Sequence, residues 1–449
     1  MPVRDLPWIA PGKAAAWLAT QAPERAFALF DSAGPIGAEA GFSYLAVDPA
    51  MVVRDAAGLA AIDSALADAA DVGLPPDHAG FSFRGGMAGM IGYDAAAAWQ
   101  GVPPRPPAAD DPPGLWLGLF DLVIGFDRAR RATRLHAVAL RRDEAAAHAR
   151  LDWAEAWLCR AAEADPPTGT LPRLGFTPDW TEAAYRERVG AILEYIRAGD
   201  IFQANFTAAH VAVRPKALDL PLVHAGLRAT NPAPFGCWLH ADGFDLISAS
   251  PERFIAMSPT GRLRTSPIKG TAPRAADPAA DHALALALAV SEKDRAENIM
   301  IVDVLRNDIG RVARIGSVRV PLLCRTETFA TVHHLVSTVE AELAPGRRAV
   351  DVLRAALPGG SITGAPKIRA IQIIAELEAA PRGPYCGTVA WIGFDGAMDS
   401  NIVIRGLVAT PQRLIAQAGG GIVADSNPAQ EYAEMRLKLS PVLRLFGAA

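Results

Sequence analysis

The sequence lacks the features of a membrane protein, a secreted protein and a general nucleic-acid binder. Its 449 residues contain no uninterrupted apolar run of the roughly 18 residues that a membrane-spanning helix needs. Residues 1–7 lack the apolar core of a secretory signal, so we expect a cytoplasmic protein. The formal net charge is −4, with both signs mixed along the chain, which argues against a nucleic-acid partner.

Cysteine is scarce, and no cysteine lies close to another in the sequence. A zinc knuckle needs ligands paired at short spacing, so this spacing argues against structural zinc. Disulfides do not persist in a reducing cytoplasm. We therefore expect buried, small apolar side chains at all of the cysteine positions, which are Cys159, Cys237, Cys324 and Cys386.

Two glycine-rich segments lack the residue order of a nucleotide site. Residues 86–92 read GMAGMIG and do not match G-x-G-x-x-G, and residues 358–367 read PGGSITGAPK and do not match G-x-x-x-x-G-K-[ST]. We therefore exclude nucleotide binding. The first segment is expected to let N-terminal strands pack closely.

Proline-rich connections indicate the organisation of the chain. Residues 101–114 and 164–178 are rich in proline and have no periodic pattern, so both are predicted to be exposed connections. The second connection separates an N-terminal subdomain, 1–170, packed on a catalytic core, 175–449. No internal repeat of fixed period occurs.

The C-terminal portion contains both helical and strand patterns. Apolar residues recur at helical spacing over 185–196, with Thr181 as the N-cap. Further helices are predicted over 297–306, from Pro366, and after the capping sequence that begins at Asn427. Strand-like runs occur at 200–207, 234–240, 244–249 and 387–394. Long antiparallel strands mixed with helices predict an α+β fold.

A lysine and a glutamate form the first candidate chemical pair. Lys269 lies in the sequence PIKGT, and Glu252 lies seventeen residues before it in SPERF. A nucleophile and an acid on neighbouring segments suit covalent chemistry on a small electrophilic substrate. The alternative interpretation is an ordinary surface turn, because lysine often precedes glycine.

The final helix carries candidate metal ligands. Glu431, Glu434 and Lys438 fall at i, i+3 and i+7, so they share one face. Glu297 lies on a separate predicted helix. Carboxylates from two helices suit a magnesium ion that keeps some of its waters. The alternative is a solvated face with salt bridges.

Candidate anion-binding groups lie near the same helix. Gly419, Gly420 and Gly421 expose backbone N–H groups to close approach, and Arg405, at the end of a strand-like run, can clamp a carboxylate. The alternatives are a flexible turn for the glycines and an ordinary surface charge for the arginine. His334 is a further candidate, although a single histidine is more often structural.

These segments together resemble the chorismate-utilising enzymes. The matching stretches, which lie between about residues 200 and 440, are GDIFQANFT, SPERF, PIKGT, KDRAENIMIVDVLRNDIGRV, VHHLVSTV, LPGGSITGAPK, CGTVAWIGFDG, IRGL and AGGGIVADSNPAQEYAE. The N-terminal FRGGMAGMIGYD also resembles this family. The resemblance implies a large mixed, mainly antiparallel β-sandwich with helices packed outside.

Two positions point to one branch of the family. Gln203 occupies the position at which isochorismate and salicylate synthases carry the lysine that activates water, and Lys269 replaces the alanine usual in anthranilate synthases. The resemblance therefore implies amination of chorismate at C4, toward p-aminobenzoate and folate. Since the sequence has no G-x-C-x-G motif, it also implies that a separate glutamine amidotransferase supplies the ammonia.

The resemblance also implies roles for individual residues. Lys269 would attack C2 of chorismate while Glu252 acts as the acid. Mg²⁺ on the ring carboxylate would be held by Glu297 and Glu434, with Glu431 beside them as a further candidate ligand. The remaining candidates would bind substrate: Arg405, Tyr385, Lys438 and Gly419, Gly420 and Gly421 at the enolpyruvyl carboxylate, Thr363 and His334 along the ring, and Gln203 at the position of the lysine base of isochorismate synthases.

Two other functions are compatible with the resemblance. One is that of anthranilate synthase component I, on the same fold. The other is a non-catalytic sensor of chorismate or tryptophan. The presence of both Lys269 and Glu252 argues against the sensor, because a protein that only binds does not need both an acid and a nucleophile.

Overall fold

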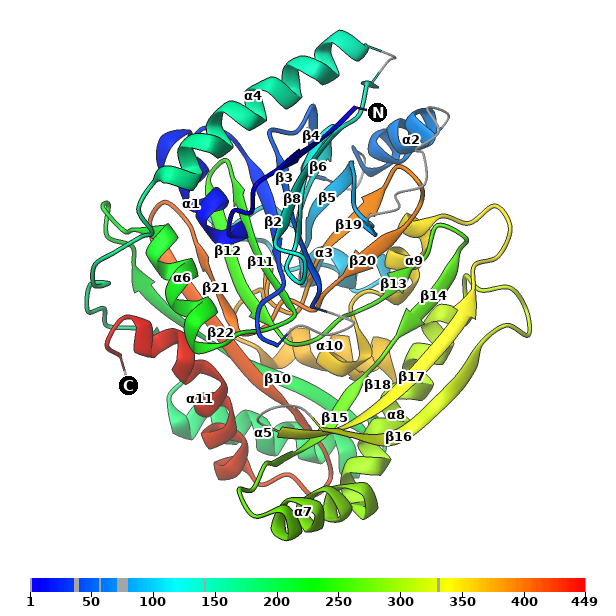
Figure 1. Ribbon diagram of the computed structural model, residues 1–449. Coiled ribbons are helices and arrows are strands. Elements are labelled where there is room, and N and C mark those ends of the chain that lie inside the picture. The colour runs from blue at the N-terminus through cyan, green and yellow to red at the C-terminus, as the bar shows by residue number, and fades with distance from the viewer. Residues whose placement is uncertain are drawn as a thin grey trace.

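The computed structural model describes residues 2–35, 40–55, 58–70, 80–140, 143–328 and 332–448. Two large antiparallel sheets form its centre, and helices cover their outer faces (Figure 1). The first sheet runs in the order β1 (Val3–Leu6), β8 (Ala132–Ala137), β7 (Leu122–Asp127), β3 (Phe42–Val47), β2 (Phe27–Asp31), β11 (Phe235–Ala241), β12 (Phe244–Ser250), β21 (Gly406–Ala409), β22 (Arg413–Ile422), β10 (Gln203–Val213) and β18 (Gly364–Ala365), and β9 (Thr177–Pro178) also pairs with β10.

The second sheet carries the strand that holds Lys269 at one edge. Its order is β15 (Ile268–Pro273), β17 (Val332–Glu342), β14 (Arg262–Thr265), β13 (Ala256–Met257), β20 (Met398–Ser400), β19 (Thr388–Gly393), β5 (Gly86–Ile91), β6 (Leu115–Phe120) and β4 (Met51–Val53), and β16 (Arg319–Thr328) also pairs with β17.

The helices of the described residues are α1 (Pro11–Gln21), α2 (Gly58–Ala70), α3 (Tyr93–Trp99), α4 (Glu144–Glu163), α5 (Glu182–Arg197), α6 (Leu220–Thr230), α7 (Pro278–Val290), α8 (Glu292–Gly310), α9 (Ala349–Ala356), α10 (Lys367–Leu377) and α11 (Pro428–Leu445). Three of them pack on strands that carry candidate residues: α11 packs on β22, α10 packs on β10, and α8 packs on β15 and β17. None of the described helices is long and apolar enough to cross a membrane.

Aromatic side chains fill the space between the two sheets. Phe83 stacks on Trp391 of the second sheet with ring centroids 5.0 Å apart, and Tyr44 of the first sheet meets the same tryptophan edge-on at 6.1 Å. Such offset and edge-to-face pairs stabilise a core beyond the area that they bury. The sheets therefore face each other as a sandwich, which confirms the predicted fold class.

The N-terminal and C-terminal portions share both sheets. Strand β2 pairs with β11 in the first sheet, and β5 pairs with β19 in the second. Residues 164–176 form neither helix nor strand, in agreement with the predicted connection 164–178 except for its last two residues, which form β9. The boundary between 1–170 and 175–449 stays a prediction, and the shared sheets place the two portions in one continuous core.

The predicted caps are confirmed, and three local predictions are wrong. Thr181 and Asn427 cap α5 and α11 through side-chain hydrogen bonds. Helix α8 begins at Glu292 rather than at residue 297, because the hydroxyl of Ser291 accepts from the amide of Asp294 and caps it earlier. Residues 402–405 form no strand, since Arg405 has φ +58°, and Cys159 is exposed rather than buried.

Candidate active site

A cleft of about 130 Å³ lies where β10, β15 and β22 meet α11. Seven of the predicted residues line it: Glu252, Lys269, Tyr385, Arg405, Gly419, Gly421 and Lys438. Its other lining residues are Asn205, Ile268, Ser361, Ile362, Ile404, Gln417 and Ala418. Segments far apart in the sequence thus bring the candidate nucleophile, the candidate acid and the candidate anion-binding groups to one cavity.

Lys269 is anchored to a carboxylate across the cleft. Its Nζ donates to Oε1 of Glu297 on α8 at 2.8 Å. The two side chains are only 16% and 19% exposed, so the pair is shielded from most of the solvent. Gly270, which has φ +81°, turns the backbone beside the lysine, and a Cβ there would lie 2.9 Å from Asp294 of α8. The glycine therefore allows β15 to approach α8 closely.

Glu252 lies in the cleft just after β12, where a serine hydroxyl contacts its carboxylate. Ser361 donates from Oγ to Oε1 of Glu252 at 2.8 Å, and the backbone amide of Ile402 donates to the Glu252 carbonyl at 3.1 Å. Burial raises the pKa of Glu252, although the Ser361 hydrogen bond and the charge of Lys269 lower it in part. A raised carboxyl pKa is what a general acid needs near neutral pH.

Basic groups gather at the end of the cleft next to α11. Lys438 donates from Nζ to the Gly419 carbonyl at 2.9 Å and to Oε1 of Glu434 at 2.6 Å. Arg405 is held against the same helix, with Nη1 3.4 Å from the Lys438 carbonyl oxygen. Arg405 has a left-handed backbone conformation, so its side chain projects from an irregular segment rather than from a strand. Two cationic side chains at one end favour a carboxylate there.

The glycine triplet lies within β22 and is not a flexible turn. Gly419 is opposite Thr207 and Gly421 is opposite Asn205 in the pairing with β10. A Cβ on Gly419 would come within 2.2 Å of the Phe206 carbonyl oxygen, and one on Gly421 within 3.0 Å of the Gln203 side chain. Because these glycines have no side chains, β22 can approach β10 closely and the cleft stays open.

The remaining predicted residues lie beside the cleft and are not among its lining residues. Gln203 is fully buried, with both atoms of its amide unpartnered, while Thr363 donates to the Gly359 carbonyl at 2.8 Å. His334 on β17 shares a 2.9 Å hydrogen bond with Thr271 through Nδ1. Glu431 accepts from the hydroxyl of Ser426 at 2.7 Å, and a Cβ on Gly420 would lie 3.1 Å from its Oε2.

A buried ion pair beneath the cleft was not anticipated from the sequence. Glu378 and Arg382 are paired at 2.7 Å with side chains only 3% and 1% exposed. Arg382 also donates to the backbone carbonyls of Ile362 and Asn205, both of which line the cleft, at 2.7 and 2.6 Å. Breaking the pair would leave an unpaired buried charge, which is very costly. The pair therefore holds Arg382, and through its hydrogen bonds the backbone that lines the cleft, in place. Its only sequence signal is the i, i+4 spacing, which is common on helices.

The donor groups of the described residues bear on the metal prediction, which stays a prediction. Among the described residues, no three His, Cys, Asp or Glu side chains gather closely enough to form a complete metal site. Glu297 and Glu434 instead pair with Lys269 and Lys438. Burial opposes ionisation of Glu434, but the charges of Lys438 and Lys269 outweigh it and lower the pKa of this carboxyl. The carboxylates are thus arranged around positive charge, which fits a hard cation that draws further ligands from water and substrate.

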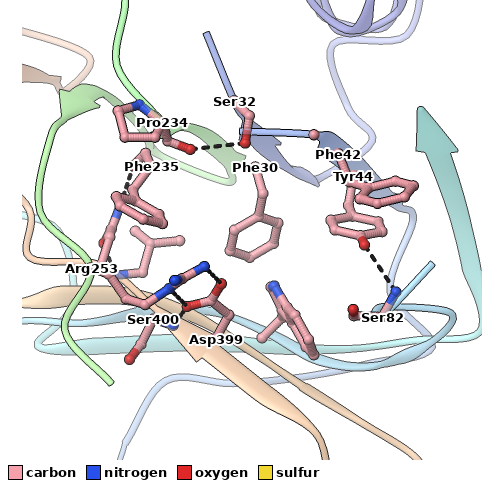
Figure 2. Close-up of a pocket in the computed structure, with 15 residues that line it drawn as sticks. Phe30, Ser32, Phe42, Tyr44, Ser82, Pro234, Phe235, Arg253, Asp399 and Ser400 are labelled. Atoms are coloured by element: carbon pink, nitrogen blue, oxygen red, sulfur yellow. Dashed lines mark hydrogen bonds and ion pairs between the residues drawn. The ribbon is translucent and has the colours of Figure 1, made fainter. Parts of the chain in front are cut away.

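A second cavity, of about 150 Å³, lies between the sheets (Figure 2). Arg253 and Asp399 form a bidentate pair on one side, at 2.9 and 3.0 Å, and Phe30 and Tyr44 from the N-terminal strands lie on the other. Its described lining residues include no lysine and no glutamate. Since both the candidate nucleophile and the candidate acid line the first cleft, we take that cleft as the candidate active site.

The sandwich and its cleft define a chorismate-binding enzyme. Residues 14–444 match the model of the chorismate binding enzyme family, and the chain belongs to this family. It is 43% identical to aminodeoxychorismate synthase component 1 of Klebsiella aerogenes, over 82% of this chain and 79% of that one. It is 40% identical to anthranilate synthase component 1 of Streptomyces coelicolor, over 95% and 86%. The crystal structure of anthranilate synthase component I from Streptococcus pneumoniae superposes with a TM-score of 0.78 at 30% identity, covering 92% of this chain and 94% of that one.

Proposed function

We propose that this protein aminates chorismate at C4 to give 4-amino-4-deoxychorismate, in the route to p-aminobenzoate and folate. The observation that carries the proposal is the presence of Lys269 and Glu252 in one cleft. Relatives named aminodeoxychorismate synthase component 1 support it. Similarity to anthranilate synthases is of comparable extent, so the choice between the two activities depends on Lys269.

The charged groups in and beside the cleft suit the two carboxylates of chorismate. Arg405 and Lys438 provide positive charge for the enolpyruvyl carboxylate, and Tyr385 lines the cavity with them. Glu297 and Glu434 would hold Mg²⁺, which would neutralise the ring carboxylate and orient it. In this proposal, these contacts would hold the ring between Lys269 and Glu252.

The chemistry then takes place in two displacements. The neutral amine of Lys269 forms a bond to C2, the ring double bonds shift, and the C4–oxygen bond breaks as Glu252 donates its proton, so that water leaves. Ammonia next forms a bond to C4, the double bonds shift back, and the bond between C2 and Lys269 breaks. The amine remains on the carbon that carried the hydroxyl, and the enolpyruvyl group is retained.

The ammonia is proposed to come from a separate glutamine amidotransferase. The relatives carry the name component 1, and the sequence has no G-x-C-x-G motif for a glutaminase nucleophile. Free ammonium in sufficient concentration can replace such a partner, because the second displacement requires ammonia itself.

The product identifies the activity. The purified chain, incubated with chorismate, Mg²⁺ and ammonium, is expected to form a non-aromatic amine that retains its enolpyruvyl group, as measured by mass spectrometry. Fluorescent anthranilate and pyruvate as the main products would instead assign the protein to the anthranilate branch. If chorismate bound without turnover, the protein would be a sensor.

A further inference from the structure

The side chain of Lys269 occupies a position that its proposed chemistry cannot use. Its Nζ is held on Oε1 of Glu297 by a 2.8 Å hydrogen bond, and this contact has to break before Nζ can bond to C2. Its charge also acts on Glu434, the carboxylate of α11 proposed as the other metal ligand. One cation thus interacts with two carboxylates from separate helices: it donates a hydrogen bond to Glu297, and its charge acts on Glu434.

We infer that in the metal-free protein Lys269 takes the place of the metal, and that Mg²⁺ binding displaces it from Glu297. This inference rests on the proposed function, because it takes Glu297 as a metal ligand. Magnesium binds oxygen ligands at short distances and in a strict geometry. Oε1 of Glu297 therefore cannot coordinate the metal and keep its hydrogen bond from Lys269 at the same time. Two cations at one carboxylate also repel each other.

The second lysine of the cleft differs from the first. Lys438 contacts Glu434 at 2.6 Å but also donates to the Gly419 carbonyl at 2.9 Å. Losing the carboxylate to a metal therefore leaves Lys438 anchored at the substrate end. Release of Lys269, by contrast, gives it freedom to reach the ring. Metal binding would thus make the nucleophile available at the same time as it completes the substrate site.

Magnesium affinity of the substrate-free full-length chain tests the exchange. We expect Lys269→Met to bind Mg²⁺ more tightly than wild type by about five- to tenfold in calorimetry, because a competing occupant lowers apparent affinity. Glu297→Gln and Glu434→Gln are expected to weaken binding. Lys293→Met is the control: Lys293 lies on α8 and its charge acts on Glu434, but it does not line the cleft, so its effect should be smaller.

The outcomes separate the exchange from the metal site. Unchanged or weaker binding by Lys269→Met, with weaker binding by Glu297→Gln, would overturn the exchange and leave the metal site in place. An equal gain in Mg²⁺ affinity in Lys293→Met would also overturn the exchange, since the loss of any nearby positive charge would then explain the gain. Unchanged binding by both glutamine variants would refute the metal site itself, whatever the product assay shows. Circular dichroism confirms folding of each variant.

An amine-reactive ester provides a second measurement that needs no turnover. Mass spectrometry of the peptide that contains Lys269 is expected to show faster modification with Mg²⁺ than without it. Slower or unchanged modification would contradict release of the amine.

A separate contact indicates how the candidate acid is held. Ser361 donates to Oε1 of Glu252 at 2.8 Å, which leaves Oε2 as the oxygen without this hydrogen bond. We infer that Ser361 is a positioning residue for Glu252. It lies in the short helical turn η2 (Gly360–Ile362), whose end is fixed by the bond from Arg382 to the Ile362 carbonyl. Charged and titratable groups around Glu252 are Lys269, Tyr385, Arg405 and Lys438 in the same cleft, and the buried Cys386, on whose thiol the charge of Glu252 acts.

The pH profile distinguishes positioning from simple packing. Ser361→Ala removes a hydrogen bond that favours the ionised carboxylate, so the basic limb of kcat/KM should move to higher pH while kcat falls about tenfold. Ser361→Thr keeps the hydroxyl and should restore both. A changed KM with no movement of the limb, or a threonine variant no better than alanine, would show that Ser361 only packs.

Discussion

Lys269→Ala is expected to abolish the covalent adduct with chorismate and to slow amination at C4 by about 10³-fold or more, equivalent to about 4 kcal/mol of transition-state stabilisation. The adduct is measured by quenching enzyme and chorismate without ammonia, digesting the protein, and searching for added mass on the peptide that contains Lys269. The physical reason is that, in the proposed mechanism, the lysine both activates C4 for displacement and blocks C2. Without it, ammonia can reach C2, so we expect some product aminated there.

Lys269→Arg is the matched control for charge. Arginine retains the positive charge beside Glu297 but stays protonated and cannot act as a nucleophile. Loss of the adduct and of C4 amination in both variants would support covalent catalysis. Full C4 amination by Lys269→Ala, with no adduct in wild type, would show that the lysine acts only electrostatically or structurally.

Local sequence signals predicted the elements around the site well. Thr181 and Asn427 were identifiable as caps because their hydrogen bonds are made within three residues along the chain. Helix α8 was predicted too short because its cap, Ser291, comes directly after α7, where no apolar pattern marks a new start. Arg405 was assigned to a strand because it follows three apolar residues, yet its backbone adopts a left-handed conformation that no local pattern reveals.

Contacts across the fold could not be predicted from sequence patterns. Lys269 and Glu297 are 28 residues apart, and Glu252 and Ser361 are 109 apart, so their pairing depends on how β15, α8 and the η2 turn pack together. The same holds for the two sheets. Strands β2 and β5 appeared to belong to a separate N-terminal subdomain, although each pairs with a strand from the C-terminal portion. Hydrophobic patterns indicate that a strand is buried, but they do not name its neighbour.

The acid can be tested separately from the nucleophile. Glu252→Gln is expected to lower kcat by roughly 10²–10⁴-fold, the range for loss of a general acid. Because the C4 hydroxyl then leaves without a proton, formation of the Lys269 adduct should slow as well, even in the absence of ammonia. An unchanged rate of adduct formation would mean that another group protonates the hydroxyl.

The pH dependence of the wild-type enzyme is expected to show whether activity requires the protonated form of Glu252. Burial raises the pKa of Glu252, so the carboxyl stays protonated at pH values where an exposed glutamate is ionised. Activity that needs this proton is therefore present below the raised pKa and is lost as the pH increases through it. The basic limb of kcat/KM should accordingly disappear in Glu252→Gln and persist, at reduced rate, in Glu252→Asp. A limb that persists unchanged in the glutamine variant would assign it to a different group and remove Glu252 from the role of acid.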